Sequence, residues 1–104
     1  MQASLIATLD IPEQDRFQLI EEHEDDHFIH TDAFLGLTYT RDLLVIEIAL
    51  TEGRSDALKK ALLADLNRRL VETADMRPDD VFVTMYEFGA VNVSFGSGLA
   101  QRAP

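Results

Sequence analysis

The longest apolar stretch of the chain runs from Leu43 to Leu50 and is rich in aliphatic, β-branched residues. This composition predicts a strand that is buried on at least one face. Thr51–Arg54 contains a glycine and predicts a turn, and Ser55 is a good helix N-cap. From Asp56 to about Ala74, leucines recur at every fourth position, which predicts an amphipathic helix. These leucines are Leu58, Leu62, Leu66 and Leu70.

A second strand is predicted at Val81–Phe88, after the turn formed by Arg77–Asp80. A strand, a helix and a second strand at this spacing form a βαβ unit. The helical crossover makes the two strands parallel.

The rest of the chain gives weaker patterns. Gln2–Leu9 fits a short helix or a poorly alternating strand, and we favour the helix. Apolar and polar residues alternate in Arg16–Glu22, which predicts a strand, and His23–Asp32 is interpreted as a loop or an edge ribbon. Val91–Phe95 alternates as a short strand after a turn at Phe88–Ala90.

The length of 104 residues indicates one α/β domain spanning residues 1–104. Residues 43–104 form a complete βαβ repeat plus a C-terminal hairpin. Residues 1–42 form a partial first repeat with one strand and a piece of helix. One full helix on such a sheet leaves apolar surface uncovered, so we expect the chain to form a homo-oligomer.

Composition excludes several classes of function. The formal charge of −10 argues against binding to nucleic acid or an anionic membrane, because such binding requires clustered Lys and Arg. The chain has no Cys, which rules out disulfides, a thiol nucleophile and Cys-based metal centres. No apolar run approaches the roughly 20 residues of a membrane span, and no signal peptide is recognisable. We therefore expect a cytoplasmic protein.

Two groups of polar residues have the chemistry of a site without the pattern of one. His23, His27 and His30 lie among six carboxylates between Glu21 and Asp32. Imidazole and carboxylate can bind a divalent ion, but runs of charge are usually solvated loops, so we predict no metal and no cofactor. Ser94 and Ser97 are flanked by glycines without the GxSxG pattern of a nucleophile.

Four short motifs in order give the chain a family resemblance. They are Pro12–Gln18, Gly53–Ser55, Pro78–Val83 and Asn92–Gly96. With them the chain resembles the tautomerase superfamily, in the branch that contains malonate semialdehyde decarboxylase. The resemblance implies two βαβ units in pseudo-twofold relation, with a mixed four-stranded-type sheet packed on helices, and assembly as a trimer. It also implies keto–enol tautomerisation of small 2-oxo or enol carboxylates, with an N-terminal proline as the base.

The resemblance also implies roles for single residues. Asp15 falls on an aspartate that helps to orient water and substrate, and Arg54 on an arginine that holds the substrate carboxylate. We assign Phe95 to substrate binding as well. Glu52 stands where the family has a second arginine and would repel a carboxylate, and Val93 replaces a common Trp.

The sequence departs from the family at its start, where Met1-Gln2 corresponds to the end of the family's first helix. The first strand and its proline have no counterpart in the chain, and the nitrogen of Pro12 is acylated. A secondary amine in an apolar, cationic site has a lowered pKa and serves as a base near neutral pH, so we expect this chain to lack that base.

We therefore predict a tautomerase-family protein whose activity as an enzyme is uncertain. The alternative is a catalytically inactive oligomeric binding or structural module. Because the family's first strand lies in the middle of the sheet, we also expect Gln2–Leu9 to rearrange or the subunits to rejoin through an altered pairing.

Overall fold

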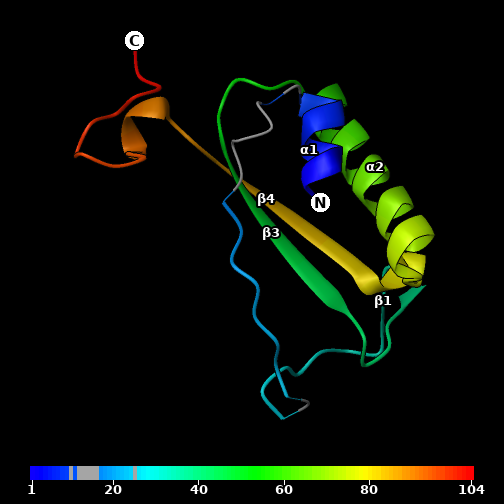
Figure 1. Cartoon of the computed structure of the whole chain (residues 1–104). Helices are drawn as coiled ribbons and strands as arrows, with labels where there is room; N and C mark the ends of the chain where they lie inside the picture. The colour runs from blue at the N-terminus through cyan, green and yellow to red at the C-terminus, as the bar shows by residue number, and fades with distance from the viewer. Residues whose placement is uncertain (10, 12–16, 25) are drawn as a thin grey trace.

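The centre of the molecule is the βαβ unit that the sequence predicts (Figure 1). The computed structural model describes residues 1–9, 11, 17–24 and 26–104. In it, β3 (Leu44–Thr51) leads into α2 (Asp56–Ala74), and β4 (Val81–Phe88) returns beside β3. The α/β fold class and all three elements are confirmed.

The pairing of β3 and β4 fixes which residues share the end of the sheet. The two strands are parallel, with Leu44 opposite Val81 and Thr51 opposite Phe88. The carboxyl ends of both strands therefore lie side by side, and the turn into α2 leaves from the same end.

Helix α2 begins where the sequence predicts and covers one face of the strand pair. The hydroxyl oxygen of Ser55 accepts a hydrogen bond from the backbone N–H of Leu58 at 3.2 Å, which caps the helix. Two leucines of the predicted stripe, Leu62 and Leu66, are fully buried. They form the core together with Ile46 and Leu50 of β3.

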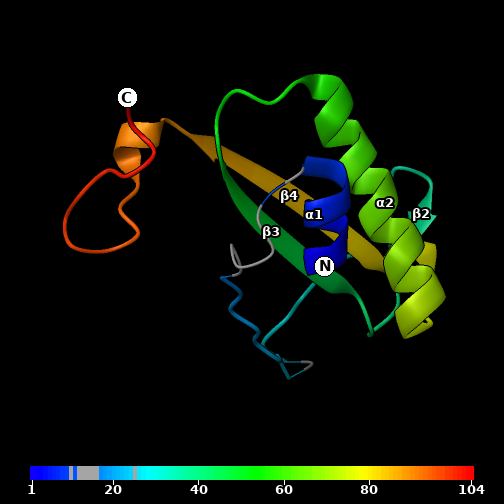
Figure 2. The same ribbon diagram turned by 45° about the horizontal axis from the view of Figure 1, so that its top comes forward.

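The first helix is also confirmed, as α1 (Gln2–Leu9). It packs against α2, and both helices lie on the same side of the β3–β4 pair (Figures 1 and 2). Ser4 is fully buried in α1 and its small side chain suits close packing. Neither described helix has the length and apolar character to cross a membrane.

A small hairpin precedes the βαβ unit. Strands β1 (Ala33–Phe34) and β2 (Leu37–Thr38) are antiparallel and form a separate two-stranded sheet. Their two-residue turn has positive φ at Leu35 (52°) and Gly36 (80°), the combination required by a tight hairpin.

The strand predicted at Arg16–Glu22 is wrong for Phe17–Glu22; Arg16 lies outside the described residues. Phe17–Glu22 has no strand, and no backbone hydrogen bond is seen between it and another described segment. Leu19 is 96% exposed. A strand requires a neighbour that completes its hydrogen-bond ladder, and alternation alone does not supply one.

The strand predicted at Val91–Phe95, the basis for a C-terminal hairpin, is also wrong. A single 3-10 turn, Ala90–Asn92, follows β4, and the chain then leaves the end of the sheet (Figure 2). The backbone N–H of Phe95 donates to the side-chain oxygen of Gln101 at 3.0 Å, so a side chain takes the place of a strand neighbour.

The four-stranded sheet does not form within the described part of the chain, where the strands belong to two separate two-stranded sheets. The β3–β4 pair carries exposed Val45, Phe82 and Tyr86. Val45 is opposite Phe82, and Tyr86 is an even number of residues from Phe82, so all three share one face of the strands. This face alternates with the face of Ile46 and Leu50, which is buried.

Candidate functional site

Arg54 lies in the turn between the carboxyl end of β3 and the first turn of α2. The carboxyl ends of parallel strands are the usual place for ligands in α/β sheets. Gly53 has φ of 120°, a conformation that a side chain would strain, and this glycine lets the chain turn sharply just before Arg54.

The side chain of Arg54 is held but not neutralised. It is partly buried, and Nη1 donates a hydrogen bond to the carbonyl oxygen of Thr51 at 3.0 Å. Within the described residues, Arg54 forms no ion pair, and in particular none with its acidic neighbours Glu52 and Asp56. A guanidinium group has five donors, so several remain for a carboxylate ligand.

Glu52 occupies the same end of the sheet. Its backbone N–H donates to the carbonyl oxygen of Phe88 at 2.8 Å, which ties it to the end of β4. Its carboxylate oxygen Oε1 lies 3.7 Å from where a side chain would begin on Gly89. The chain thus places one acidic and one basic side chain two residues apart without joining them in an ion pair.

Lys59, the next cation along the chain, is already engaged. Its Nζ lies 2.6 Å from Oε1 of Glu87 on β4 and 3.8 Å from Oδ1 of Asp56. The hydrogen bond to Glu87, more than the nearby charges, raises the pKa of Lys59. Lys59 therefore stays charged and paired, which links α2 to β4 and leaves Arg54 as the cation of this turn.

Phe95 lies beyond the end of β4 in the C-terminal segment. Its ring centroid is 5.9 Å from that of Phe17, and the guanidinium carbon of Arg102 lies 6.0 Å from the ring centroid. The described contacts do not join Phe95 to Arg54. Asp15, the third residue assigned from the sequence, lies outside the described residues.

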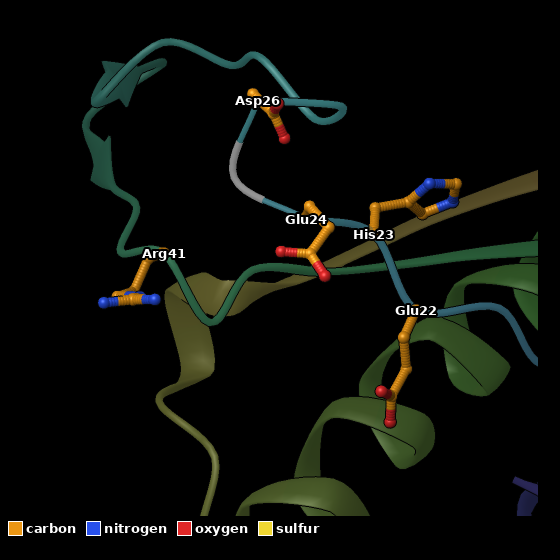
Figure 3. A pocket seen from close by; sticks show the side chains of 5 residues that line it. All are labelled: Glu22, His23, Glu24, Asp26 and Arg41. Carbon is orange, nitrogen blue, oxygen red and sulfur yellow. The ribbon is translucent and has the colours of Figure 1, made fainter.

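A depression of about 380 Å³ lies at the acidic loop, far along the chain from Arg54. Five side chains line it: Glu22, His23, Glu24, Asp26 and Arg41. They do not converge on a common centre, and Glu22 and Arg41 point in different directions (Figure 3). In the described part of the chain, no three His, Asp or Glu side chains come together as a metal ion would need.

Sequence reasoning missed one buried cluster, which holds the start of β4. Asp80 is 2% exposed, and its carboxylate accepts hydrogen bonds from Thr40, through the backbone N–H at 2.8 Å and the hydroxyl at 2.5 Å. Arg77 Nη1 lies 3.5 Å from the same carboxylate. Burial raises the pKa of Asp80, but the bonds from Thr40 and the charge of Arg77 outweigh it, so the pKa is lowered.

The neighbouring carboxylate continues this cluster. Asp79 accepts a hydrogen bond from the backbone N–H of Thr38 at 3.0 Å, and Arg77 donates to the carbonyl oxygen of Thr38 at 3.3 Å. The Asp79-Asp80 pair directly before an apolar strand was the only sequence signal for this cluster. The sequence does not show that the fold brings Thr38 and Thr40 beside the pair. These residues connect the β1–β2 hairpin to the βαβ unit and hold the strands rather than a ligand.

The family model for the tautomerase enzyme matches residues 15–96. The probable tautomerase YusQ of Bacillus subtilis (strain 168) is 32% identical over 98 residues, which cover 94% of this chain and 77% of YusQ.

Two solved structures share the fold. FG41 malonate semialdehyde decarboxylase, inhibited by 3-bromopropiolate, superposes with a TM-score of 0.87 and 30% identity, covering 96% of this chain and 76% of that one. The fused 4-OT protein R7, an asymmetric trimer, superposes with a TM-score of 0.74 and 19% identity, and the match covers 96% of this chain and 78% of the R7 chain. At this identity the likeness shows the fold alone. On the family model and the identity to YusQ, the chain belongs to the tautomerase enzyme family.

Proposed function

We propose that this protein binds small 2-oxo or enol carboxylates at the carboxyl end of β3, as a member of a family whose reaction moves a proton between carbon and oxygen. The observation that carries the proposal is Arg54: partly buried, anchored by the carbonyl of Thr51, and free of any ion pair among the described residues. FG41 malonate semialdehyde decarboxylase acts on a small carboxylate and is inhibited by another, which supports a carboxylate as the ligand class here.

Each residue has a distinct role in the proposal. Arg54 binds the carboxylate through its remaining donors, and this bond holds the 2-oxo group in a fixed orientation. Phe95 is proposed as an apolar contact for the ligand on the assignment made from the sequence; its ring is about half exposed. Asp15 assists by orienting water or substrate, as the family resemblance implies.

Proton transfer requires a base in addition to a bound carboxylate. The three prolines of the sequence, Pro12, Pro78 and Pro104, all have acylated nitrogens and cannot act as the amine base. We infer that these 104 residues by themselves bind the ligand without catalysing its tautomerisation. The second candidate function is an inactive oligomeric binding module.

The test of catalysis is the ketonisation of phenylenolpyruvate by the 104-residue chain. We expect these 104 residues to give the rate of the buffer alone, because none of their three prolines has a free secondary amine. A rate well above the buffer rate that disappears in Arg54→Ala but persists in Lys60→Ala would show that the chain is an enzyme as it stands. Lys60 is a matched control, being an exposed cation in the early turns of α2.

We also propose that the protein is a homo-oligomer, most simply a trimer. The exposed apolar face with Val45, Phe82 and Tyr86 supports this, as does the trimeric assembly of the fused 4-OT protein R7. Native mass spectrometry should give about 35 kDa, three times the chain mass of 11.7 kDa. A species of 11.7 kDa at micromolar concentration would contradict the proposal.

A further inference from the structure

Two exposed apolar surfaces lie on different parts of the chain. One is the hairpin tip, Phe34–Leu37, and the other is the β3–β4 face formed by Val45, Phe82 and Tyr86. We propose that the hairpin tip of one copy of the chain docks on the β3–β4 face of the next copy, so that the contact runs head to tail around a closed ring. This inference rests on the homo-oligomer of the proposed function and names the two surfaces that meet in it.

The turn at the hairpin tip contains an unfavourable residue. Leu35 has φ of 52°, in the left-handed region that leucine rarely adopts and that asparagine and glycine adopt readily. Two-residue hairpin turns of this kind favour Asn-Gly, whereas the chain has Leu35-Gly36. The Leu35 side chain is 83% exposed, so burial within its own subunit does not offset the strain. A contact with another copy would bury this side chain and offset it.

The base of the hairpin is firmly held. Asp79, directly before β4, accepts a hydrogen bond from the backbone N–H of Thr38 in β2. Asp80 accepts two more from Thr40, two residues after β2. The tip therefore projects from a fixed base beside the start of β4 (Figure 1). An element that is already ordered loses less conformational entropy on docking than a mobile loop does.

The exposed area of the chain is large for its mass. The chain exposes 7806 Å², whereas a folded monomer of 11.7 kDa should expose about 5,900 Å². The excess of about 1,900 Å² is more than the roughly 1,600 Å² that two standard contacts would cover on one subunit, at about 800 Å² each. A head-to-tail ring gives every subunit two contacts, one through its tip and one through its face.

Charge favours docking of the tip on the face over pairing of two faces. Glu47 is exposed on the same face as Val45, and its carboxylate lies 3.5 Å from the hydroxyl of Tyr86. Two faces packed together would bring the Glu47 carboxylates of both copies into one contact, where like charges repel. The hairpin Ala33–Thr38 contains no charged residue, so its tip can cover the apolar part of the face without this repulsion.

Cross-linking can test which surfaces meet, because the chain has no cysteine of its own. Leu35→Cys and Phe82→Cys are co-expressed as a pair, one of them carrying an affinity tag, and treated with a short bis-maleimide. The matched control pairs Leu35→Cys with Leu63→Cys. Leu63 is 39% exposed, close to the 45% of Phe82, but it belongs to α2, which covers the opposite face of the strands.

We expect the Leu35→Cys and Phe82→Cys pair to give a covalent mixed dimer of about 23 kDa, twice the chain mass of 11.7 kDa. Its yield should be at least about fivefold higher than in the control pair or in either variant alone, because a head-to-tail contact joins two different surfaces. Cross-linking of either variant mainly to itself would show a symmetrical contact. Equal yields in the test and control pairs would show random collision, and either result would overturn the proposal.

Leu35→Asn tests the tip without a cross-linker. Asparagine suits the left-handed turn better than leucine, so the variant removes the apolar side chain and keeps the hairpin. The protein concentration at half dissociation of the oligomer should rise by about tenfold or more, because each contact loses a buried leucine. The melting midpoint of the dissociated subunit should not fall, which separates this loss from damage to the fold. An unchanged concentration at half dissociation would overturn the proposal.

Native mass spectrometry separates this inference from the homo-oligomer itself. If the wild type has a mass of about 35 kDa, three times 11.7 kDa, and both the cross-linking and Leu35→Asn fail to behave as expected, the homo-oligomer stands and the docking of the tip on the face is wrong. A wild-type mass of 11.7 kDa at micromolar concentration would contradict the homo-oligomer and the docking together.

Discussion

Two regions of this chain have similar apolar patterns and very different structures. The βαβ unit of β3, α2 and β4 buries Ile46, Leu50, Leu62 and Leu66. Phe17–Glu22 also alternates apolar and polar residues, but its apolar side chains are exposed and its backbone is not paired with a described strand. The two regions differ because the βαβ unit itself contains the second strand that pairs with the first and the helix that covers them.

The largest expected effect comes from the core of the βαβ unit. Leu66→Ala removes a fully buried side chain between α2 and the strands and leaves a cavity. We expect the free energy of unfolding to fall by about 2–5 kcal/mol, measured by urea denaturation. A loss below about 1 kcal/mol would contradict the view that this unit holds the fold.

An intermediate effect is expected at the buried carboxylate. Asp80→Asn keeps the shape but loses the negative charge that Thr40 and Arg77 stabilise. The free energy of unfolding at pH 7 should fall by about 1–3 kcal/mol, and Asp79→Asn, at a half-buried carboxylate, should cost less.

The pH dependence gives this prediction a second readout. Because folding lowers the pKa of Asp80, its contribution is present above the unfolded value of 3.8 and is lost as pH falls through the folded pKa. The difference between the wild type and Asp80→Asn should therefore shrink below about pH 4. A difference that grows on acidification would show that the carboxylate is not stabilised by these bonds.

Asp65 on α2 should contribute to acid unfolding in the same sense. Hydrogen bonds from Arg69 and Arg68 lower its pKa to about 2. Its stabilising effect is thus present above pH 3.8 and is lost on acidification toward pH 2. Asp65→Asn should remove this part of the acid dependence, which thermal melts between pH 5 and pH 2 would measure.

The smallest effect is expected in the exposed segment. Leu19→Ser changes a side chain that is 96% exposed and should alter the free energy of unfolding by no more than about 0.5 kcal/mol. A loss above 2 kcal/mol would mean that Leu19 is buried in the assembled protein. Comparing this variant with Leu66→Ala on one denaturation series tests the contrast between the two regions directly.

The sequence predicted the structure correctly where the strands and helix that pack together follow one another in the chain. The leucine stripe, the Ser55 cap and the two apolar strands predicted the βαβ unit, because each signal is local. The predictions failed at Phe17–Glu22 and Val91–Phe95, where strand formation depends on a neighbour that alternation does not reveal. The Asp80 cluster was not predicted, since it joins residues about 40 positions apart.

For the candidate site too, local features could be predicted and contacts between distant residues could not. The position of Arg54 after a strand and before a helix could be predicted from the sequence, and the structure adds its anchoring to Thr51 and the engagement of Lys59 by Glu87. The roles of Arg54, Phe95 and Asp15 in binding stay predictions, and the described contacts do not bring Phe95 to Arg54.

The most direct test of the central claim is the dissociation constant of 2-oxopentanoate, followed through the amide signals of Ser55 and Asp56 beside Arg54. Charged hydrogen bonds contribute about 1.5–3 kcal/mol, so Arg54→Ala should weaken binding by about tenfold or more. Lys60→Ala should change it by less than about twofold, because this exposed cation is outside the proposed site. Equal binding by the wild type and Arg54→Ala would contradict the claim that Arg54 holds the carboxylate.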